Sequence, residues 1–476
     1  MELSPNTYIA KNEHLFQKLL DGLLAKYQFA SILAMDSSAK SYRVSRQGID
    51  ISGSPLFDSR GFVARIFKDG EFFEYSGSEI TENGIPEIIG AITELTDRKT
   101  DGLKAFSTLS DFAVPEEEVI SFEKSTGAEI LPEDLSDEKV IEKLSLIRKQ
   151  GLGYSDNVLD CMVRVAYQRY GKLYLSKNKN LKQNILWADG MIGCIARAGQ
   201  EIKQSFGTYS NLGGLEVLNK MEKEAPELAE KVLELLESKP MIPGEYDCIC
   251  SPAVTGMIVH EAFGHGVEMD MFVKNRALAK DFIGKQVASP LINMRDAAVG
   301  VDQTATYFFD DEGTLSTNTL IIEKGILKQG ISDLQSAKTL GTVPTGNGRR
   351  ESFARKPYTR MTNTFFEAGT DKLPDMIASI KDGFLLEHPS SGMEDPKNWG
   401  IQCMVTTARE IKDGKLTGKL FSPIVLTGYV PDLLKSITMV SEDVKLSGSG
   451  MCGKGHKEWV KVSDGGPYIK ARILLG

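Results

Sequence analysis

Apolar residues in the first 95 positions recur at helical spacing in two stretches and gather in short strand-like runs between them. The helical spacing predicts amphipathic helices over about 12–27 and 82–95. The last two strand-like runs are separated by Asp69-Gly70, a strong signal for a tight hairpin turn. The predicted strands are residues 29–36, 41–47, 61–67 and 72–76. Together these elements predict a first α+β unit, in which helices cover one side of a sheet.

A second unit with a similar order of elements follows a polar connection over residues 96–135. It begins with a predicted helix at 137–150 and closes with an acidic helix at 213–238. The strand-like runs between these helices are residues 157–166, 170–177 and 183–198. Because no residue-level repeat accompanies the shared order, duplication is only a suggestion.

The composition changes at residues 239–245, where two prolines and a glycine precede a glycine-rich stretch of short alternating runs. Beyond this point only about 253–266 and 372–381 are predicted to be helical. A β-rich C-terminal domain fits this pattern. The predicted fold class is therefore α+β, with two N-terminal helix/antiparallel-sheet units followed by the β-rich domain. The predicted boundaries are 1–110, 111–240 and 241–476.

The bulk composition is that of an acidic, soluble protein. The chain has 476 residues, 41% of them hydrophobic and 25% charged, and a net charge of −9. No Lys/Arg block rises above this background, which argues against direct nucleic-acid binding. The first residues lack a basic segment followed by an apolar run, and no apolar stretch reaches the roughly 18 residues of a membrane span. The six cysteines are scattered, so we expect thiols rather than disulfides and a cytoplasmic location.

The segment 251–270 carries the candidate chemistry. Its first part is apolar at helical spacing, which places His260 and Glu261 on a largely buried helix. Familiar zinc-peptidase helices separate two histidines by four residues, whereas His265 stands five residues after His260. Five residues turn a regular α-helix by about 500°, so the two imidazoles would face apart. A π-bulge or a break at Gly264 would bring them together, and otherwise they would be helix-packing histidines.

A metal site needs a third ligand, and the chain offers few candidates. Of its five histidines, His14 lies on the predicted opening helix, where a surface role is expected. Near the C-terminus, a glycine-dense loop from Gly448 to His456 places Cys452 where the backbone can approach a site closely. One thiolate and two imidazoles suit zinc and leave a fourth position for water. The thiolate favours zinc over iron or manganese, although ligand type alone does not exclude iron.

Further motifs extend this pattern over essentially the whole chain. They are PGEYDCICSP at 243–252, HEAFGHGVEMD at 260–270, DDEGT at 310–314, PTGNGRR at 344–350, RMTNT at 360–364, GMCGKGH at 450–456 and GGP at 465–467. In this order they resemble the TldD branch of the TldD/PmbA peptidase family, whose members have long been described as modulators of DNA gyrase. The resemblance implies one zinc per chain on His260, His265 and Cys452, with Glu261 as catalytic acid/base.

The resemblance also implies an activity and partners. It indicates a peptidase acting on unfolded or leader-type peptides, in which the metal activates water and Glu261 is the general base. The PmbA branch lacks the histidine motif and serves as an inactive partner. A homodimer and a heterodimer with a PmbA/TldE-like chain both fit, and this chain would be the active subunit. The alternative is a non-catalytic interaction protein, acting as a gyrase modulator or a PmbA-like partner, with a structural metal.

Four polar residues are weaker candidates for substrate contacts, since surface ion pairs or solvent exposure would explain them as well. They are Asn347, Arg349, Arg350 and His456. The run Asp310-Asp311-Glu312 resembles a hard-cation cluster, but a turn between strands is the better interpretation. The pair Cys248 and Cys250 is interpreted as core packing. Residues 389–402 depart from the glycine-rich segment expected of the family, which leaves substrate choice and partner binding open.

Overall fold

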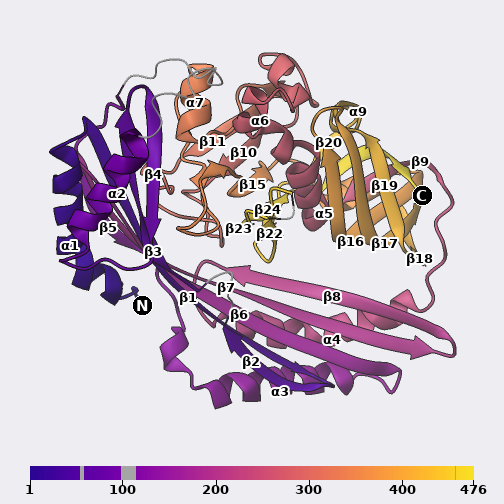
Figure 1. The fold of residues 1–476 in the computed structure, drawn as a ribbon. Helices are drawn as coiled ribbons and strands as arrows, with labels where there is room; N and C mark the ends of the chain where they lie inside the picture. The colour runs from indigo at the N-terminus through magenta and orange to yellow at the C-terminus, as the bar shows by residue number, and fades with distance from the viewer. Residues whose placement is uncertain (54–57, 98–113, 456) are drawn as a thin grey trace.

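The computed structural model describes residues 1–53, 58–97, 114–455 and 457–476. Strands of the N-terminal half form one long sheet, and those of the C-terminal half form two larger sheets and two short ribbons (Figure 1). Helices and strands are mixed throughout, so the predicted α+β fold class is confirmed. None of the described helices combines the length and apolarity needed to cross a bilayer.

The N-terminal sheet has eight strands, of which six follow the order β4-β3-β1-β6-β7-β5, while β2 pairs with β1 and β8 with β7. Their bounds are β1 (Phe29–Ser45), β2 (Gly48–Gly53), β3 (Ser59–Lys68), β4 (Glu71–Gly77), β5 (Ile120–Ser125), β6 (Val158–Ser176), β7 (Lys179–Ala198) and β8 (Glu201–Asn211). The expected hairpin between β3 and β4 turns at Asp69 and Gly70, both with positive φ.

The two predicted N-terminal units share this sheet, because β1 pairs antiparallel with β6 from Ser31↔Ser176 to Val44↔Val163. The run 29–36 and most of the run 41–47 belong to one strand, which ends at Ser45, and the polar residues between them concealed its continuity. Ladder hydrogen bonds join backbone groups, so a polar stretch can continue a strand. No described sheet combines strands from before and after residue 240.

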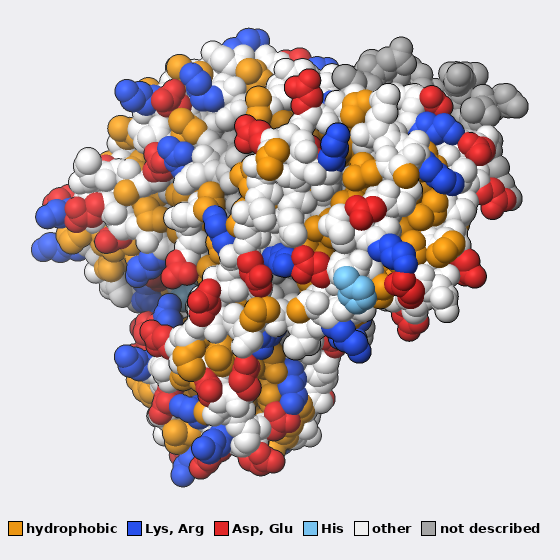
Figure 2. All heavy atoms as spheres, turned by 90° about the vertical axis from the view of Figure 1, so that its left-hand side faces the viewer, with side chains coloured by type: hydrophobic (Ala, Val, Ile, Leu, Met, Phe, Trp, Pro, Cys, Tyr) orange, Lys and Arg blue, Asp and Glu red, His pale blue; other side chains and the backbone are white. Residues whose placement is uncertain are grey.

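Four longer helices cover the N-terminal sheet in two pairs, close to their predicted positions. They are α1 (Thr7–Leu24), α2 (Ile85–Asp97), α3 (Asp137–Leu152) and α4 (Val217–Leu235). α1 and α2 share a core with β1 and β3, whereas α3 and α4 share another with β6 and β7. On the face in Figure 2, acidic and basic side chains are interspersed with apolar ones, and no broad patch of one sign is visible.

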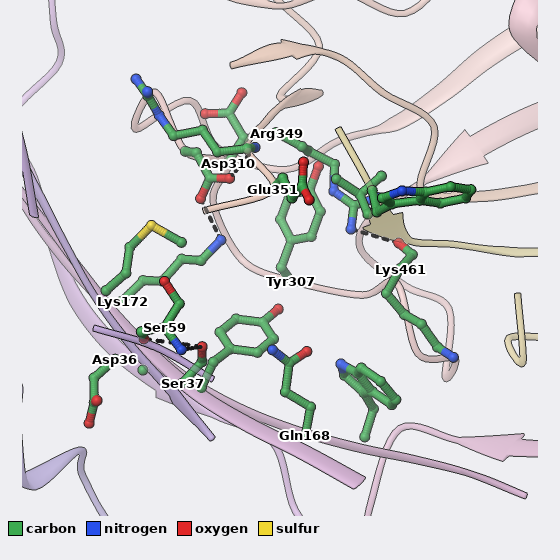
Figure 3. Close-up of a pocket in the computed structure, with 18 of the residues that line it drawn as sticks. Asp36, Ser37, Ser59, Gln168, Lys172, Tyr307, Asp310, Arg349, Glu351 and Lys461 are labelled. Carbon is green, nitrogen blue, oxygen red and sulfur yellow. Dashed lines mark hydrogen bonds and ion pairs between the residues drawn. The ribbon is translucent and has the colours of Figure 1, made fainter. Parts of the chain in front are cut away.

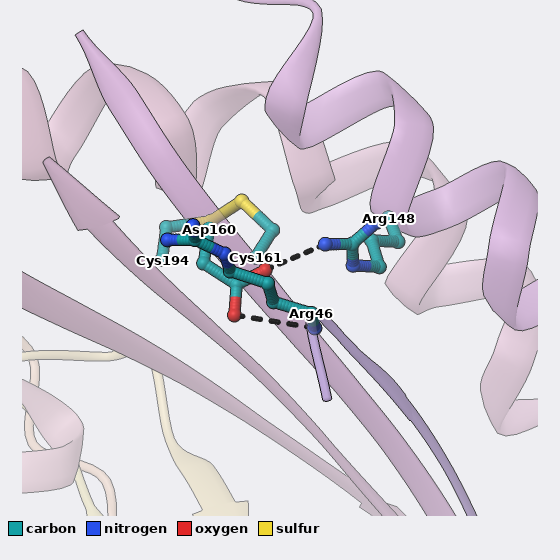
Figure 4. The surroundings of a disulfide bond; sticks show 5 residues. All are labelled: Arg46, Arg148, Asp160, Cys161 and Cys194. Carbon is teal, nitrogen blue, oxygen red and sulfur yellow. Dashed lines mark hydrogen bonds and ion pairs between the residues drawn. A yellow bond between two sulfur atoms is a disulfide. The ribbon is translucent and has the colours of Figure 1, made fainter. Parts of the chain in front are cut away.

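Two cysteines beneath α3 form a disulfide, contrary to the expectation of free thiols. Cys161 of β6 stands directly opposite Cys194 of β7 in the antiparallel register, and this pairing brings their side chains together (Figure 4). Arg148 of α3 covers the pair by donating a hydrogen bond to Asp160 at 2.7 Å. The described cysteines outside this pair are free and buried.

The C-terminal half contains a closed five-stranded ring, in which β16 pairs with both β9 and β17 while β25 and β19 complete the circuit. Its strands are β9 (Gly244–Cys250), β16 (Asp382–Asp395), β17 (Gly400–Lys412), β19 (Ile424–Tyr429) and β25 (Ile469–Leu475), with β18 (Lys415–Phe421) and β20 (Met439–Val440) at its margins. Cys248 and Cys250 lie in its core, as interpreted from the sequence.

A six-stranded sheet and two ribbons lie between this ring and the N-terminal sheet (Figure 1). The sheet contains β10 (Met294–Ala297), β11 (Asn318–Glu323), β12 (Ile326–Leu327), β15 (Asn363–Phe366), β21 (Lys445–Ser447) and β24 (Ser463–Gly466). The ribbons are β13 (Gly348–Arg349) with β14 (Tyr358–Thr359), and β22 (Met451–Cys452) with β23 (Val460–Lys461). Short helices complete the region: α5 (Pro252–Met257), α6 (Met269–Val273), α7 (Leu334–Leu340), α8 (Leu373–Ala378) and α9 (Val430–Lys435).

Candidate metal centre

The two histidines of the motif lie on a helix that changes its winding between them. α5 continues into a π-helical turn over Ile258–Gly264, followed by a 3₁₀ turn over His265–Val267. The N–H of His265 donates to the carbonyl of His260, five residues earlier. This winding brings the imidazoles onto one side, with ring centroids 5.0 Å apart. The π-bulge inferred from the five-residue spacing is therefore present.

Two glycines allow this helix to pack closely against neighbouring segments. A Cβ on Gly256 would lie 2.6 Å from the amide nitrogen of Gly465 in β24. A Cβ on Gly264 would collide with the sulfur of Met361. Larger residues at these positions would push the helix away from the strands that it contacts, so the glycines help to position the histidines.

Cys452 completes a group of three potential metal ligands. It lies on β22, whose pairing with β23 fixes the strand beside the π-helical turn. Its Sγ is 3.4 Å from Nε2 of His265, although 187 residues separate the two in sequence. One ligand atom from each of His260, His265 and Cys452 lies within 4.8 Å of the others.

The electrostatics of this group suit a metal ion. Burial opposes charge on the Cys452 thiol, but His265 and His260 lower its pKa well below the ordinary value. Burial alone would depress the pKa of His265, yet Cys452 and Glu268 raise it well above the usual range. The buried Nδ1 of His260 has no hydrogen-bond partner among the described residues. A thiolate beside two imidazoles is a donor set that fits zinc.

Three charged residues behind the ligands hold them in place. Glu268 Oε2 lies 3.6 Å from Nδ1 of His265, the nitrogen facing away from Cys452. Arg360 Nη2 donates to the Cys452 carbonyl at 2.8 Å, and Lys454 Nζ reaches Glu268 at 3.1 Å. Contacts of this kind orient the side chains that bind a metal and determine which ring nitrogen of a histidine carries the proton. Sequence reasoning assigned these three residues no role, although Glu268 stands only three residues after a proposed ligand.

Glu261 faces the strand β16 rather than the charged residues behind the ligands. A Cβ on Gly392 would lie 2.6 Å from Cγ of Glu261, so this glycine leaves room for the glutamate. Burial raises the pKa of Glu261, while His260 and His265 oppose the rise. Gly392 belongs to the segment 389–402 that departs from the family pattern, and this segment therefore forms a wall beside Glu261.

The structure describes three of the four weaker candidates for substrate contacts. Asn347 is buried and donates to Asp296 at 2.8 Å. Arg350 forms an ion pair with Glu74 of the N-terminal sheet. Arg349 Nη2 donates to the Lys461 carbonyl at 2.7 Å, beside a cleft between the N-terminal sheet and the second ribbon (Figure 3). His456 lies outside the described residues.

The run Asp310-Asp311-Glu312 forms a turn, as interpreted, but the turn is buried rather than exposed to solvent. Protein groups bind all six carboxylate oxygens of this run. Backbone N–H groups bind both oxygens of Asp310, whereas Asp311 and Glu312 are each bound by one cationic side chain and one backbone N–H. The cations are Lys172 and Arg65, both from the N-terminal sheet. We call these three acidic residues the acidic turn.

A comparison with protein families identifies the C-terminal part of the chain. The model of the PmbA/TldA metallopeptidase C-terminal domain matches residues 243–473, a range that contains all three potential ligands. These residues belong to the PmbA/TldD family. The resemblance inferred from the motifs is thereby confirmed.

Curated relatives of this chain are named metalloproteases. The zinc metalloprotease TldD homolog of Saccharolobus solfataricus is 33% identical over 52% of this chain and 55% of its own length. The metalloprotease TldD homolog of Buchnera aphidicola subsp. Acyrthosiphon pisum is 35% identical over 50% of this chain and 49% of its own length. A metalloprotease of Methanothermobacter thermautotrophicus is 29% identical over 60% of this chain and 62% of its own length. The chain thus spans about half to three fifths of the length of these relatives.

Solved structures share the fold over nearly the whole chain. A protein of Thermotoga maritima described as a modulator of a DNA gyrase has a TM-score of 0.77 and 17% identity, covering 98% of this chain and all of its own. TldE from Thermococcus kodakarensis has a TM-score of 0.75 and 18% identity, covering 97% of this chain and all of its own. At these identities the likeness establishes the fold alone.

Proposed function

We propose that this chain is a zinc-dependent peptidase, with one ion held by His260, His265 and Cys452. The observation that carries the proposal is the convergence of these three side chains, from segments 187 residues apart, close enough to Glu261 for all three to affect its pKa. The names of the curated relatives support the same activity. An ion held there would supply a Lewis acid that polarises the scissile carbonyl and activates water.

Glu261 carries out the proton transfers in this proposal. A carboxylate oxygen of Glu261 accepts the proton that water loses as its oxygen bonds to the peptide carbon. The same proton then passes to the amide nitrogen, whose bond to that carbon breaks.

The proposed substrates are unfolded or leader-type peptides bound in an extended form. Among the described strands, β22 pairs with β23 alone, so the strand carrying Cys452 has an edge that an extended peptide could join. We also propose that the chain acts as a dimer, with a second copy or with a TldE-like chain. The close similarity of its fold to that of TldE supports such a partner.

The test compares the full chain with its Glu261→Gln variant, both loaded with one equivalent of zinc, on a quenched fluorescent unfolded peptide. We expect the variant to keep its zinc and lose at least about 100-fold in turnover, because general-base catalysis is removed. Glu245→Gln, which alters an exposed carboxylate on β9, is the matched control and should retain turnover. Full turnover in Glu261→Gln would overturn its role. Absence of hydrolysis by the wild type, alone and with a TldE-like chain, would favour the non-catalytic alternative.

A further inference from the structure

Glu394 is a carboxyl group beside the candidate metal centre that the proposed mechanism does not use. It lies near the end of β16, and neither of its buried carboxylate oxygens has a hydrogen-bond partner among the described residues. The residue as a whole is half-buried, since its backbone lies near the surface while its carboxyl group points inward. An unpartnered buried carboxyl group is costly and calls for an explanation.

The position of Glu394 follows from its strand. Glu394 and Gly392 are two residues apart on β16, and both are less exposed than the residues on either side. Gly392 leaves room for Cγ of Glu261. The face of β16 that includes Gly392 and Glu394 therefore packs against the histidine motif. A Cβ on Gly266, the residue after His265, would lie 2.8 Å from Glu394 Oε1. Glu394 therefore faces the segment that holds both the general base and a proposed ligand.

A second unpartnered polar group lies next to this carboxyl group. The same Cβ position on Gly266 is 3.5 Å from Nε1 of Trp399, a buried indole donor that also lacks a hydrogen-bond partner among the described residues. The rings of Phe282 and Phe263 fix the indole, with centroids 4.6 and 5.9 Å from it. Glu394 and Trp399 thus offer two carboxylate acceptors and one rigid N–H donor beside the segment that holds His265.

No lysine or arginine of the described residues forms an ion pair with Glu394. Lys454 and Arg360, which lie behind the candidate ligands, are occupied by Glu268 and by backbone carbonyls. Burial raises the pKa of Glu394 well above its ordinary value and Glu261 adds to the rise, while His265 and the backbone N–H of Gly266, too poorly aligned for a regular hydrogen bond, oppose it. A positive group entering from outside would therefore find an acceptor that the protein leaves unpaired.

We propose that Glu394 binds an alkylammonium group of the peptide substrate, next to the scissile bond, and thereby determines specificity. Trp399 Nε1 would donate to a carbonyl oxygen close to that ammonium group. The ammonium group is either the free N-terminus of the peptide or a lysine side chain, which offer the same chemistry. This inference rests on the proposed peptidase function, and it assigns a substrate preference to the segment 389–402.

The experiment measures binding separately from turnover. The full zinc-loaded chain carrying Glu261→Gln is titrated with matched peptides that have a free or an acetylated N-terminus. A second pair of acetylated peptides has lysine or norleucine beside the scissile position. We expect one amine-bearing peptide to bind at least about tenfold tighter than its partner, as a charge-assisted hydrogen bond predicts. The pair that shows the difference identifies the source of the ammonium group.

Glu394→Gln keeps the shape of the side chain and removes its charge, so the tenfold difference should fall below about twofold. Glu387→Gln, on the same strand and paired with Arg409, is the matched control and should preserve the difference. In the wild-type background, Glu394→Gln should raise KM for the amine-bearing peptide and leave that for the blocked peptide nearly unchanged. If Glu394→Gln does not fold, the two peptide pairs still test the wild-type site.

Equal affinity within both peptide pairs, or a difference that survives Glu394→Gln, would overturn the inference. Hydrolysis of the blocked peptides by the wild-type chain would then still support the peptidase proposal. Conversely, an amine preference in binding without hydrolysis of any peptide would overturn the peptidase proposal and preserve the binding role of Glu394.

Discussion

Two buried groups of charged residues differ in whether the chain satisfies its own polar atoms. In the acidic turn, protein groups bind every carboxylate oxygen. Around His260, His265 and Cys452, a ring nitrogen, a carboxyl group and an indole N–H lack partners among the described residues. Buried polar groups are normally paired, so the first group joins the two halves of the molecule, whereas the second leaves atoms for a ligand.

The largest expected effect belongs to the second group. Cys452→Ala should reduce the zinc content from about one ion per chain to less than about a tenth of an ion per chain, because it removes the thiolate and leaves only the two imidazoles as ligands. Elemental analysis of protein purified without chelator measures this. Cys250→Ala, a buried free thiol on β9, is the matched control and should keep its zinc. Zinc retained in Cys452→Ala would remove the cysteine from the ligand set and weaken the contrast between the two groups.

A smaller but substantial effect is expected when the acidic turn loses a cation. Arg65→Met leaves Glu312 without its buried ion-pair partner, which should lower the free energy of unfolding by about 3–5 kcal/mol. Urea unfolding measures the change, and zinc content should stay constant. Lys18→Met, which breaks an exposed pair with Glu82, should cost no more than about 1 kcal/mol. Equal costs for both variants would contradict a structural role for the acidic turn.

The smallest expected effect depends on pH and concerns Asp333, which caps α7 by accepting from Ser336 N–H at 2.6 Å. Burial raises its pKa to about 6, and Glu312 of the acidic turn adds to the rise. Since the unfolded value is about 3.9, the folded chain holds more protons between these two values. This group therefore lowers the free energy of unfolding as pH rises from about 4 to 6.

Asp333→Asn can retain the cap but cannot titrate, so it should lack this part of the pH dependence. The free energy of unfolding of the variant, relative to the wild type, should increase by on the order of 2 kcal/mol between pH 4 and pH 7. Urea unfolding at the two pH values measures the difference. A constant difference across this range would mean that Asp333 does not titrate as its surroundings indicate.

The sequence by itself predicted the candidate metal ligands and determined much of the local structure. The five-residue histidine spacing indicated a π-bulge or a break if both histidines bind one ion, and the structure contains a π-helical turn there. Helical periodicity located the four longer helices because each buries one apolar face against the sheet. The motif order identified the family that the match over 243–473 supports.

Only the tertiary structure decided which distant residues meet. The pairing of β1 with β6, the strand β8 and the Cys161–Cys194 bridge depend on strand register, which a single sequence does not specify over long separations. The roles of Arg360, Lys454 and Glu394 appeared only once the chain had brought them beside the motif. The role of a buried charged residue depends on whether it has partners among the described residues. Those partners come from distant parts of the sequence, so only the folded chain shows them.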